Sequence, residues 1–325
     1  NKELTPHQKY EAAMDMVNAG DTSNGIKLLV EAAELGNTYA QNQLGYYHLY
    51  GEILDKNESR AFAYFSKSAE HGNMYAQYNL GVMYHKGLGI SRSINSAVRW
   101  YKNSAEQGYL PSTYMLGKIY QDKRDHKKAF TYFSKASENG HAASQYELGM
   151  MLIDFPTRIR KEIEYIAGKR RTLAPVYREA RRDSDFERAI EYLGMISDIK
   201  KKEDRLSYEL IRHKRMDIDK DEHQGLNWLK KSAMQNNSLA QLELGMLFYH
   251  DSGMTYEKDE YKPYKSRVRY RYQAYAWLSL VADKFVRETH DEIQAVINHL
   301  TDSMTEYDLS RAEELLKQLK DEIED

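Results

Sequence analysis

Apolar and small residues recur along this chain at spacings of three, four and eight residues, a periodicity of helices rather than of strands. One pattern is a Leu-Gly pair that follows a small residue at a distance of four positions, or about one helical turn. The pairs are Leu44-Gly45, Leu80-Gly81, Leu116-Gly117, Leu148-Gly149 and Leu244-Gly245, preceded by Ala40, Ala76, Ser112, Ser144 and Ala240. This pattern predicts the first helix of a repeated unit.

A second pattern consists of a small residue, large apolar side chains three and four positions later, and another small residue at the eighth position. Ala61 with Tyr64 and Phe65 is one copy. Further copies begin at Gly25, Ala97, Ala129, Gly225 and Ala274, and a weaker one begins at Ala189. We expect helix pairs in which the small residues let two backbones approach and the aromatic side chains fill the groove between successive pairs.

Three copies of the second pattern end at glycine, namely Gly72, Gly108 and Gly140. Glycine adopts the left-handed conformation that ends a helix without the steric cost that other residues meet. We therefore expect the chain to turn at these three positions.

Two stretches make the repeat specific: AQNQLGYYHLYGEILDKNESRAFAYFSKSAEHG at 40–72 and AQYNLGVMYHKGLGISRSINSAVRWYKNSAEQG at 76–108. Both resemble Sel-1-like repeats, relatives of tetratricopeptide repeats with a longer loop between the two helices. The resemblance covers most of residues 20–155 and 223–285. It implies an all-α fold, a right-handed α/α solenoid of tandem helix-turn-helix repeats with inserted segments and a C-terminal capping helix.

The regular spacing fails between Gly149 and Gly225, so this stretch is either an insertion or a set of degenerate units. Ala189 and Leu193 fit the second-helix pattern, which leaves an inserted loop and helix before them. A single solenoid over residues 1–325 then divides into regular repeats at 1–152, an irregular basic insertion and degenerate repeat at 153–222, further repeats at 223–285 with an inserted arm at 253–272, and C-terminal capping helices at 286–325.

The insertion is rich in arginine and lysine, with Arg158, Arg160, Lys161, Lys169, Arg170, Arg171, Arg178, Arg181 and Arg182. A solvated helical excursion explains such a charge run, and a docking patch for an acidic partner is the alternative.

The arm contains YKPYKSRVRYRYQAY at 261–275, in which cations alternate with tyrosines. We interpret it as an extended arm that packs its tyrosines on the solenoid while its arginines reach water. Protein docking is the functional alternative, and a grip on phosphates and bases is a further one. We hypothesise that Arg267, Arg269 and Arg271 contribute to docking a partner.

The C-terminus predicts a closing element, because a repeat array must cover the apolar flank of its last unit. One apolar stripe recurs at helical spacing, formed by Leu309, Ala312, Leu316, Leu319 and Ile323. Thr305 and Asp308 mark the start of that helix. The segment from Tyr275 to Ala312 is similar to the ending of many bacterial members of the family, which implies a bacterial source.

Composition adds limits to this picture. The chain has 325 residues, 30% of them charged, and a formal net charge of −2, which gives no global attraction to nucleic acid or anionic membranes. It has no cysteine and no apolar run of the length, about 18 residues, that spans a bilayer. It opens at Asn1 without an initiator Met, so an upstream segment was either removed by processing or is not included in this sequence. A removed export signal is one candidate, which slightly favours an exported or periplasmic protein over a cytoplasmic one.

Motifs that carry chemistry are absent or incomplete. No Gly-rich phosphate loop, zinc helix or nucleophile elbow occurs. Asp217, Asp219 and Asp221 resemble the start of a calcium loop that lacks its later ligands, so they are expected to favour the next helix N-terminus instead. Ser197 and Lys200 match one motif of penicillin-recognising enzymes without its companions. We expect no catalytic, cofactor-binding or metal-binding residues.

Tyrosine is abundant, with 27 copies, and Tyr78, Tyr114 and Tyr146 share one repeat position. They form either inter-repeat packing or an aromatic ladder on the concave side, where tyrosines make good anchors. We expect a non-enzymatic scaffold or adaptor that binds a protein or peptide, as the resemblance also implies. Alternatives are a binder or enzyme of cell-wall glycan, peptide or β-lactam, and a nucleic-acid binder through the basic inserts. The oligomeric state stays open.

Overall fold

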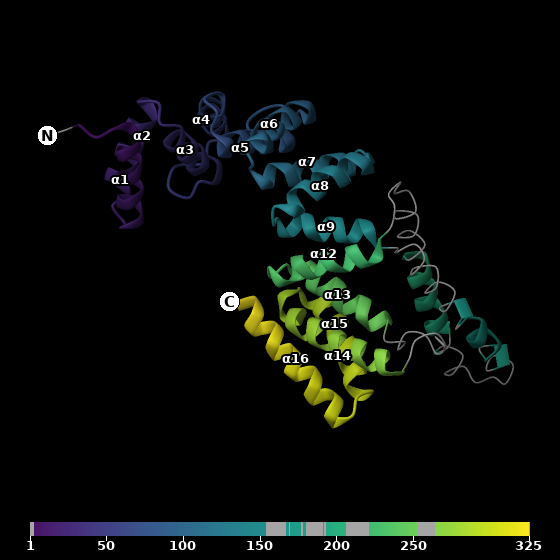
Figure 1. Cartoon of the computed structure of the whole chain (residues 1–325). Helices are drawn as coiled ribbons and strands as arrows, with labels where there is room; N and C mark the ends of the chain where they lie inside the picture. The colour runs from purple at the N-terminus through teal and green to yellow at the C-terminus, as the bar shows by residue number, and fades with distance from the viewer. Residues whose placement is uncertain are drawn as a thin grey trace. The chain divides into compact units, whose positions relative to one another are not determined.

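The computed structural model describes residues 3–153, 221–251 and 264–324, together with 167–168, 170–176, 178–179, 191 and 193–205. Throughout this described part the regular elements are helices, which confirms the all-α solenoid of helix-turn-helix repeats (Figure 1). The helices group into two compact units, residues 1–141 and residues 142–325.

The first unit is a series of helix pairs, each helix 13 residues long. The pairs are α1 (Pro6–Asn18) with α2 (Thr22–Glu34), α3 (Thr38–Tyr50) with α4 (Glu58–Glu70), α5 (Met74–Lys86) with α6 (Ile94–Glu106), and α7 (Leu110–Asp122) with α8 (His126–Glu138). The equal lengths follow from the sequence period, because each helix carries one copy of the apolar pattern.

In three of these pairs, α3/α4, α5/α6 and α7/α8, an aromatic ring of the second helix lies against the glycine of the first. A Cβ added at Gly45 would lie 2.8 Å from the ring of Phe65, and one at Gly81 would lie 2.7 Å from the ring of Tyr101. The same rings also belong to core clusters with the first helix of the next pair, Phe65 with Leu80 and Tyr101 with Leu116, so the expectation that they fill the groove between successive pairs is confirmed. The missing side chain leaves a hollow on the first helix, and the ring fills it at close-packed distance.

The turns between pairs confirm the glycine prediction. Gly72 has a φ of +87°, and Gly108 and Gly140 have φ values of +88° and +86°. After α4, the amide of Gly72 donates to the Ala69 carbonyl (3.0 Å) and that of Asn73 to the Ser68 carbonyl (3.2 Å), the pair of bonds that closes a Schellman turn.

Buried glutamines join one pair to the next. The side-chain amide of Gln41 donates to the carbonyl of Ala33 (2.9 Å), and that of Gln77 donates to the carbonyl of Ala69 (3.2 Å). Each carbonyl lies at the C-terminal end of a second helix, where it also accepts from the amide of the turn glycine, Gly36 or Gly72. The glutamine adds a second hydrogen bond to that carbonyl and ties the first helix of one pair to the end of the preceding pair.

The second unit repeats the same pairing across a much longer connection. α9 (Ala142–Leu152) packs on α12 (Glu222–Met234), and a Cβ added at Gly149 would lie 2.8 Å from Leu229. α12 is thus the second helix of the helix pair that begins with α9. Leu193, assigned to a degenerate second helix, is 50% exposed, so that assignment is wrong for this residue. Ala189 lies outside the described residues.

The next pair is α13 (Ser238–Asp251) with α14 (Tyr264–Val281). The expectation of an extended arm through residue 272 is wrong for residues 264–272, because they are the first turns of α14. Tyr270, in this segment, packs on the core and stacks on Phe248 at 5.9 Å between ring centroids. α14 has 18 residues, more than the 13 of the second helices in the first unit. Its first turns are helical because extending an existing helix is favourable and because Tyr270 keeps its contact with the core.

The chain closes with a short 3₁₀ turn, η1 (Ala282–Lys284), and two helices, α15 (Arg287–Asp302) and α16 (Glu306–Glu324). The predicted closing helix is confirmed: α16 packs on α14, with Ala312 and Leu319 buried. Its predicted start is confirmed too, since Thr305 and Asp308 cap it reciprocally, with the Asp308 amide 3.1 Å from the Thr305 hydroxyl.

Candidate functional site: a tyrosine row in the first unit

The three tyrosines that share a repeat position are packing residues in part. Tyr78 in α5 is half-buried, with its ring 5.8 Å from that of Tyr101 and 5.3 Å from that of Tyr109. Burial raises the pKa of Tyr78 above its usual value, with a smaller contribution from Tyr50. Tyr114 in α7 lies 5.9 Å from Phe133.

Tyr146 belongs to α9 in the second unit, where it packs against the core of that unit. Burial of tyrosine rings between helices contributes apolar contact in the same way at each of these positions. The rings of Tyr78 and Tyr114 thus pack both within their own helix pair and against a residue that precedes the next first helix, Tyr109 or His141. The placement of Tyr78, Tyr114 and Tyr146 on a concave face stays a prediction.

A different set of tyrosines forms a continuous row along the first unit. The ring of Tyr39 lies 5.9 Å from that of Tyr10 and 6.4 Å from that of Tyr75. The ring of Tyr75 lies 5.2 Å from that of Tyr109, in an edge-to-face arrangement. We call Tyr10, Tyr39, Tyr75 and Tyr109 the tyrosine row.

The row follows from the positions of its tyrosines, three of which stand at the start of a first helix while Tyr10 lies one turn into α1. Tyr39 and Tyr75 are the second residues of α3 and α5, and Tyr109 is the N-cap residue of α7. Because successive first helices stack side by side, residues at equivalent positions come within ring contact. Sequence reasoning missed this row, although Tyr39 and Tyr75 each stand directly before the small residue of the first-helix pattern.

The row is accessible at its centre. Tyr39 is 46% exposed and Tyr75 is 38% exposed, which are high values for side chains in ring contact with neighbours. Burial, the largest cause, raises the pKa of Tyr109, and the hydroxyls of Tyr78 and Tyr75 add to the shift. The row presents apolar ring faces together with hydroxyl groups that can donate and accept hydrogen bonds.

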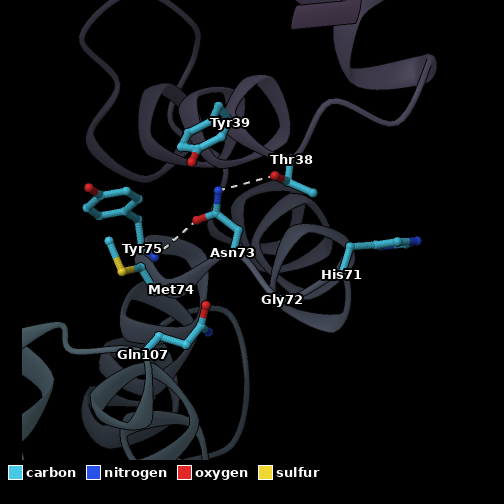
Figure 2. Close-up of a pocket in the computed structure, with 8 residues that line it drawn as sticks. All are labelled: Thr38, Tyr39, His71, Gly72, Asn73, Met74, Tyr75 and Gln107. Atoms are coloured by element: carbon cyan, nitrogen blue, oxygen red, sulfur yellow. Dashed lines mark hydrogen bonds between the residues drawn. The ribbon is translucent and has the colours of Figure 1, made fainter.

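A pocket of about 290 Å³ opens between Tyr39 and Tyr75 (Figure 2). It is lined by Thr38, Tyr39, His71, Gly72, Asn73, Met74, Tyr75 and Gln107. Figure 2 shows Asn73 at its centre, where its amide donates to the Thr38 hydroxyl at 3.3 Å and accepts from the Tyr75 amide at 3.0 Å. Helix-capping bonds therefore fix the polar floor, and the two exposed rings form the walls.

The pocket is better suited to binding a side chain of a peptide or protein than to catalysing a reaction. A stacked aromatic surface buries a partner's apolar groups with little loss of side-chain entropy. His71, at the rim, has its Nδ1 2.7 Å from the Lys67 carbonyl, as expected for a histidine at a helix end. In the part of the chain that the structure describes, no group of three acidic, histidine or cysteine side chains is placed to hold a metal ion.

The motifs weighed for chemistry occupy structural or exposed positions. The carboxylate of Asp221 accepts from the Gln224 amide at 3.0 Å and caps α12, which confirms its expected helix-start role. Asp217 and Asp219 lie outside the described residues. Ser197 and Lys200 are exposed on one helical segment.

The arginines proposed for docking all fall in α14. Arg269 is exposed, whereas the guanidinium of Arg271 donates to the Ser303 carbonyl at 3.3 Å. The neighbouring Tyr272 hydroxyl donates to Asp308, and burial followed by this bond raises the pKa of Tyr272 to about 12. Arg271 thus has a role at the end of α15, while the side chain of Arg267 lies outside the described part.

The sequence model of the Sel1 repeat matches residues 38–73, 75–109, 111–141, 211–237 and 238–262. The first three matches coincide with the pairs α3/α4, α5/α6 and α7/α8. The chain belongs to the Sel1 repeat family, as the sequence resemblance predicts. Proteins of this family generally mediate protein–protein interactions, and the scaffold is generally non-enzymatic.

Two solved structures are similar to this chain. A protective antigen present in uropathogenic Escherichia coli, displaying an SLR fold, is 24% identical with a TM-score of 0.38, over 92% of this chain and 64% of that one. A Sel1 repeat protein from Oxalobacter formigenes is 24% identical with a TM-score of 0.42, over 82% and 96% of the two chains. This chain therefore spans less than two thirds of the antigen's length. A comparison with curated proteins found no match.

Proposed function

We propose that this protein is a non-enzymatic scaffold that binds a protein or peptide partner along the tyrosine row. The supporting observation is the exposure of Tyr39 and Tyr75 at the centre of a row whose rings are otherwise in mutual contact. Stacking of the first unit needs the buried sides of these rings and not their exposed faces. The exposed faces supply rigid aromatic anchors of the kind that dominates binding energy at protein interfaces.

The pocket between these rings adds selectivity. Its volume of about 290 Å³ accommodates one or two side chains, and Asn73 and Gln107 offer amide groups at its floor. A partner side chain that enters the pocket would bury apolar area against Tyr39 and Tyr75 while its backbone meets those amides. This combination is typical of sites that recognise a segment rather than a small metabolite.

The test is affinity capture from the native organism with the double variant Tyr39→Ala/Tyr75→Ala. We expect a protein retained by the wild type to be lost or weakened at least tenfold, since each aromatic anchor contributes on the order of 1–2 kcal/mol or more. Tyr307→Ala is the matched control, because Tyr307 is an exposed tyrosine (72%) of α16 in the other unit. Equal retention by the double variant and the control would contradict the proposal.

A second contact is proposed at α14, where Arg269 is exposed beside the tyrosines of the same helix. An exposed guanidinium next to aromatic side chains suits the rim of an interface, where it steers an acidic partner. Arg269→Ser is expected to weaken capture of the same partner by roughly twofold to fivefold, as rim charges do. Unchanged capture would remove α14 from the interface.

A further inference from the structure

A second pocket lies on α4, away from the residues that line the first. It has a volume of about 270 Å³ and is lined by His48, Arg60, Ala63, Tyr64 and Lys67. Arg60 and Lys67 are seven positions apart on α4, so two helical turns bring them to the same face with Tyr64 between them. The small side chain of Ala63 leaves the space between the two cations open.

The aromatic wall of this pocket is held rigidly. The ring of His48 stacks on Tyr64 at 5.9 Å between centroids with an angle of 11° between planes. The Nδ1 of His48 lies 3.1 Å from the Asp55 carbonyl, so Nδ1 carries the proton and donates. His48 is 6% exposed, which fixes the ring in place.

The two cations are exposed and, among the described residues, neither Arg60 nor Lys67 has an acidic partner within ion-pair distance. The nearest acid of the first turn of α4 is engaged elsewhere. Glu58 pairs with Lys56 at 3.2 Å, and its other oxygen accepts from the Gly89 amide at 3.0 Å. The pocket therefore presents positive charge that the fold does not neutralise.

The equivalent place on α8 also has a stacked aromatic pair, but one of its cations is neutralised. There Tyr120 stacks on Tyr132 at 5.5 Å, and Lys128 and Lys135 take the positions of Arg60 and Lys67. Lys128 is held by Asp125 at 2.7 Å, the residue that caps α8.

α4 is capped instead by a neutral amide, Asn57, which accepts from the Arg60 backbone amide at 2.9 Å and leaves the guanidinium without an acid. The stacked rings are thus common to both repeats. The uncompensated charge distinguishes the pocket on α4.

We propose that the pocket of His48, Arg60, Ala63, Tyr64 and Lys67 binds a side-chain carboxylate from an acidic segment of the protein partner, an inference that rests on the proposed function. The guanidinium of Arg60 can grip a carboxylate with two parallel hydrogen bonds, and the ammonium of Lys67 adds a second charge. The stacked rings give the methylene groups of a glutamate an apolar wall. The net charge of −2 disfavours extended polyanions such as nucleic acid, while a local cationic pocket selects short acidic segments.

The test uses the full chain and a fluorescein-labelled hexaglutamate peptide, followed by fluorescence anisotropy at low salt. We expect Arg60→Gln/Lys67→Gln to weaken binding about tenfold, since one lost charge-assisted hydrogen bond suffices for that factor. The matched control is Lys128→Gln/Lys135→Gln, which makes the same change of charge at the equivalent place and is expected to change the affinity less than about twofold. Circular dichroism checks that both variants remain folded.

Each outcome decides the assignment. Equal weakening by the two double variants would mean that the peptide follows overall charge, which overturns the pocket, and so would an absence of hexaglutamate binding to the wild type. Hexaglutamine is expected not to bind. Tyr39→Ala/Tyr75→Ala should bind hexaglutamate like the wild type, so failure of the tyrosine row in partner capture is distinguishable from failure of this pocket.

Discussion

The two units use the same helix-pair contact with very different connections. In the first unit, α5 and α6 are joined by residues 87–93, and Gly81 receives the ring of Tyr101. In the second, α9 and α12 are joined by residues 153–221, and Gly149 receives the side chain of Leu229 in the same way. The pairing therefore depends on the complementary surfaces of the two helices and not on the length of chain between them.

The helix pair tolerates a long connection because the entropic cost of closing a longer loop is small. Loop-closure entropy grows only with the logarithm of length, so a roughly tenfold longer loop costs about 2 kcal/mol. The buried contacts of one pair exceed that cost, since each fully buried Leu contributes about 1.5–3 kcal/mol. A Sel1 unit can therefore carry a large insertion at this loop while the repeat contact persists. The comparison yields four predictions.

The largest effect is expected from removing α16, the cap of the second unit. A chain that ends at Ser303 exposes the apolar surface that Ala312, Leu316 and Leu319 cover, a loss of more than about 5 kcal/mol in that unit. Differential scanning calorimetry should show the second unit losing its transition, or aggregating, while the first unit melts as before. A chain that ends at Lys320 keeps these contacts and is the control. A stable, monomeric Ser303 truncation would show that another surface closes the unit.

The next effect concerns the glycine contact that both units share. Gly81→Leu and Gly149→Leu are each expected to lower stability by about 1–3 kcal/mol, because an added Cβ would lie 2.7 Å from Tyr101 or 2.8 Å from Leu229. Gly149→Leu should cost more, since its Cβ also meets the Gly225 carbonyl oxygen at 2.9 Å and backbone cannot move aside as a ring can. Gly194→Ala, with nothing within 4 Å, is the control. Unchanged melting temperatures would refute the shared contact.

Shortening the long connection tests the loop argument directly. Replacing residues 154–220 by the α5–α6 connection, residues 87–93, is expected to raise the stability of the second unit by up to about 2 kcal/mol. Chemical denaturation monitored by the fluorescence of Trp228 and Trp277, both in that unit, measures the change. A clear loss of stability would instead show that the insertion contributes contacts to the pair.

The smallest expected effect is a difference in stability between two variants in α14, Arg271→Ser and Arg269→Ser. Arg271→Ser removes the hydrogen bond to the Ser303 carbonyl and should cost about 1 kcal/mol of stability. Arg269→Ser should change stability by less than about 0.5 kcal/mol, because its side chain is exposed. Thermal unfolding of the two variants makes the comparison. Equal stability would mean that the Arg271 bond is not maintained in solution.

Much of the fold was predictable because it depends on local period and helix ends. The Leu-Gly pairs, the turn at Gly72 and the closing helix with its cap at Thr305 follow from residues that are near one another in the chain. The insertion was harder to interpret, because Leu193 matches the apolar pattern although it is 50% exposed. A short pattern records helix period and does not say which helix the apolar face meets.

For the candidate site, the type of residue could be predicted but its position could not. Tyrosine abundance pointed to aromatic anchors, but the position chosen from the repeat, that of Tyr78 and Tyr114, is half-buried in packing. The exposed row passes through Tyr39 and Tyr75, whose contact joins residues 36 positions apart across two stacked helices. Exposure of one face of a ring is decided by its neighbours in space.

The sequence by itself determined the helix-pair pattern and the residues that end its helices, because these features depend on interactions within one or two turns of chain. Only the tertiary structure decided that α12 completes the helix pair begun by α9 and that tyrosines of successive helix pairs meet in a row. Those outcomes depend on which surfaces meet across long stretches of chain, and loop length hardly constrains that choice.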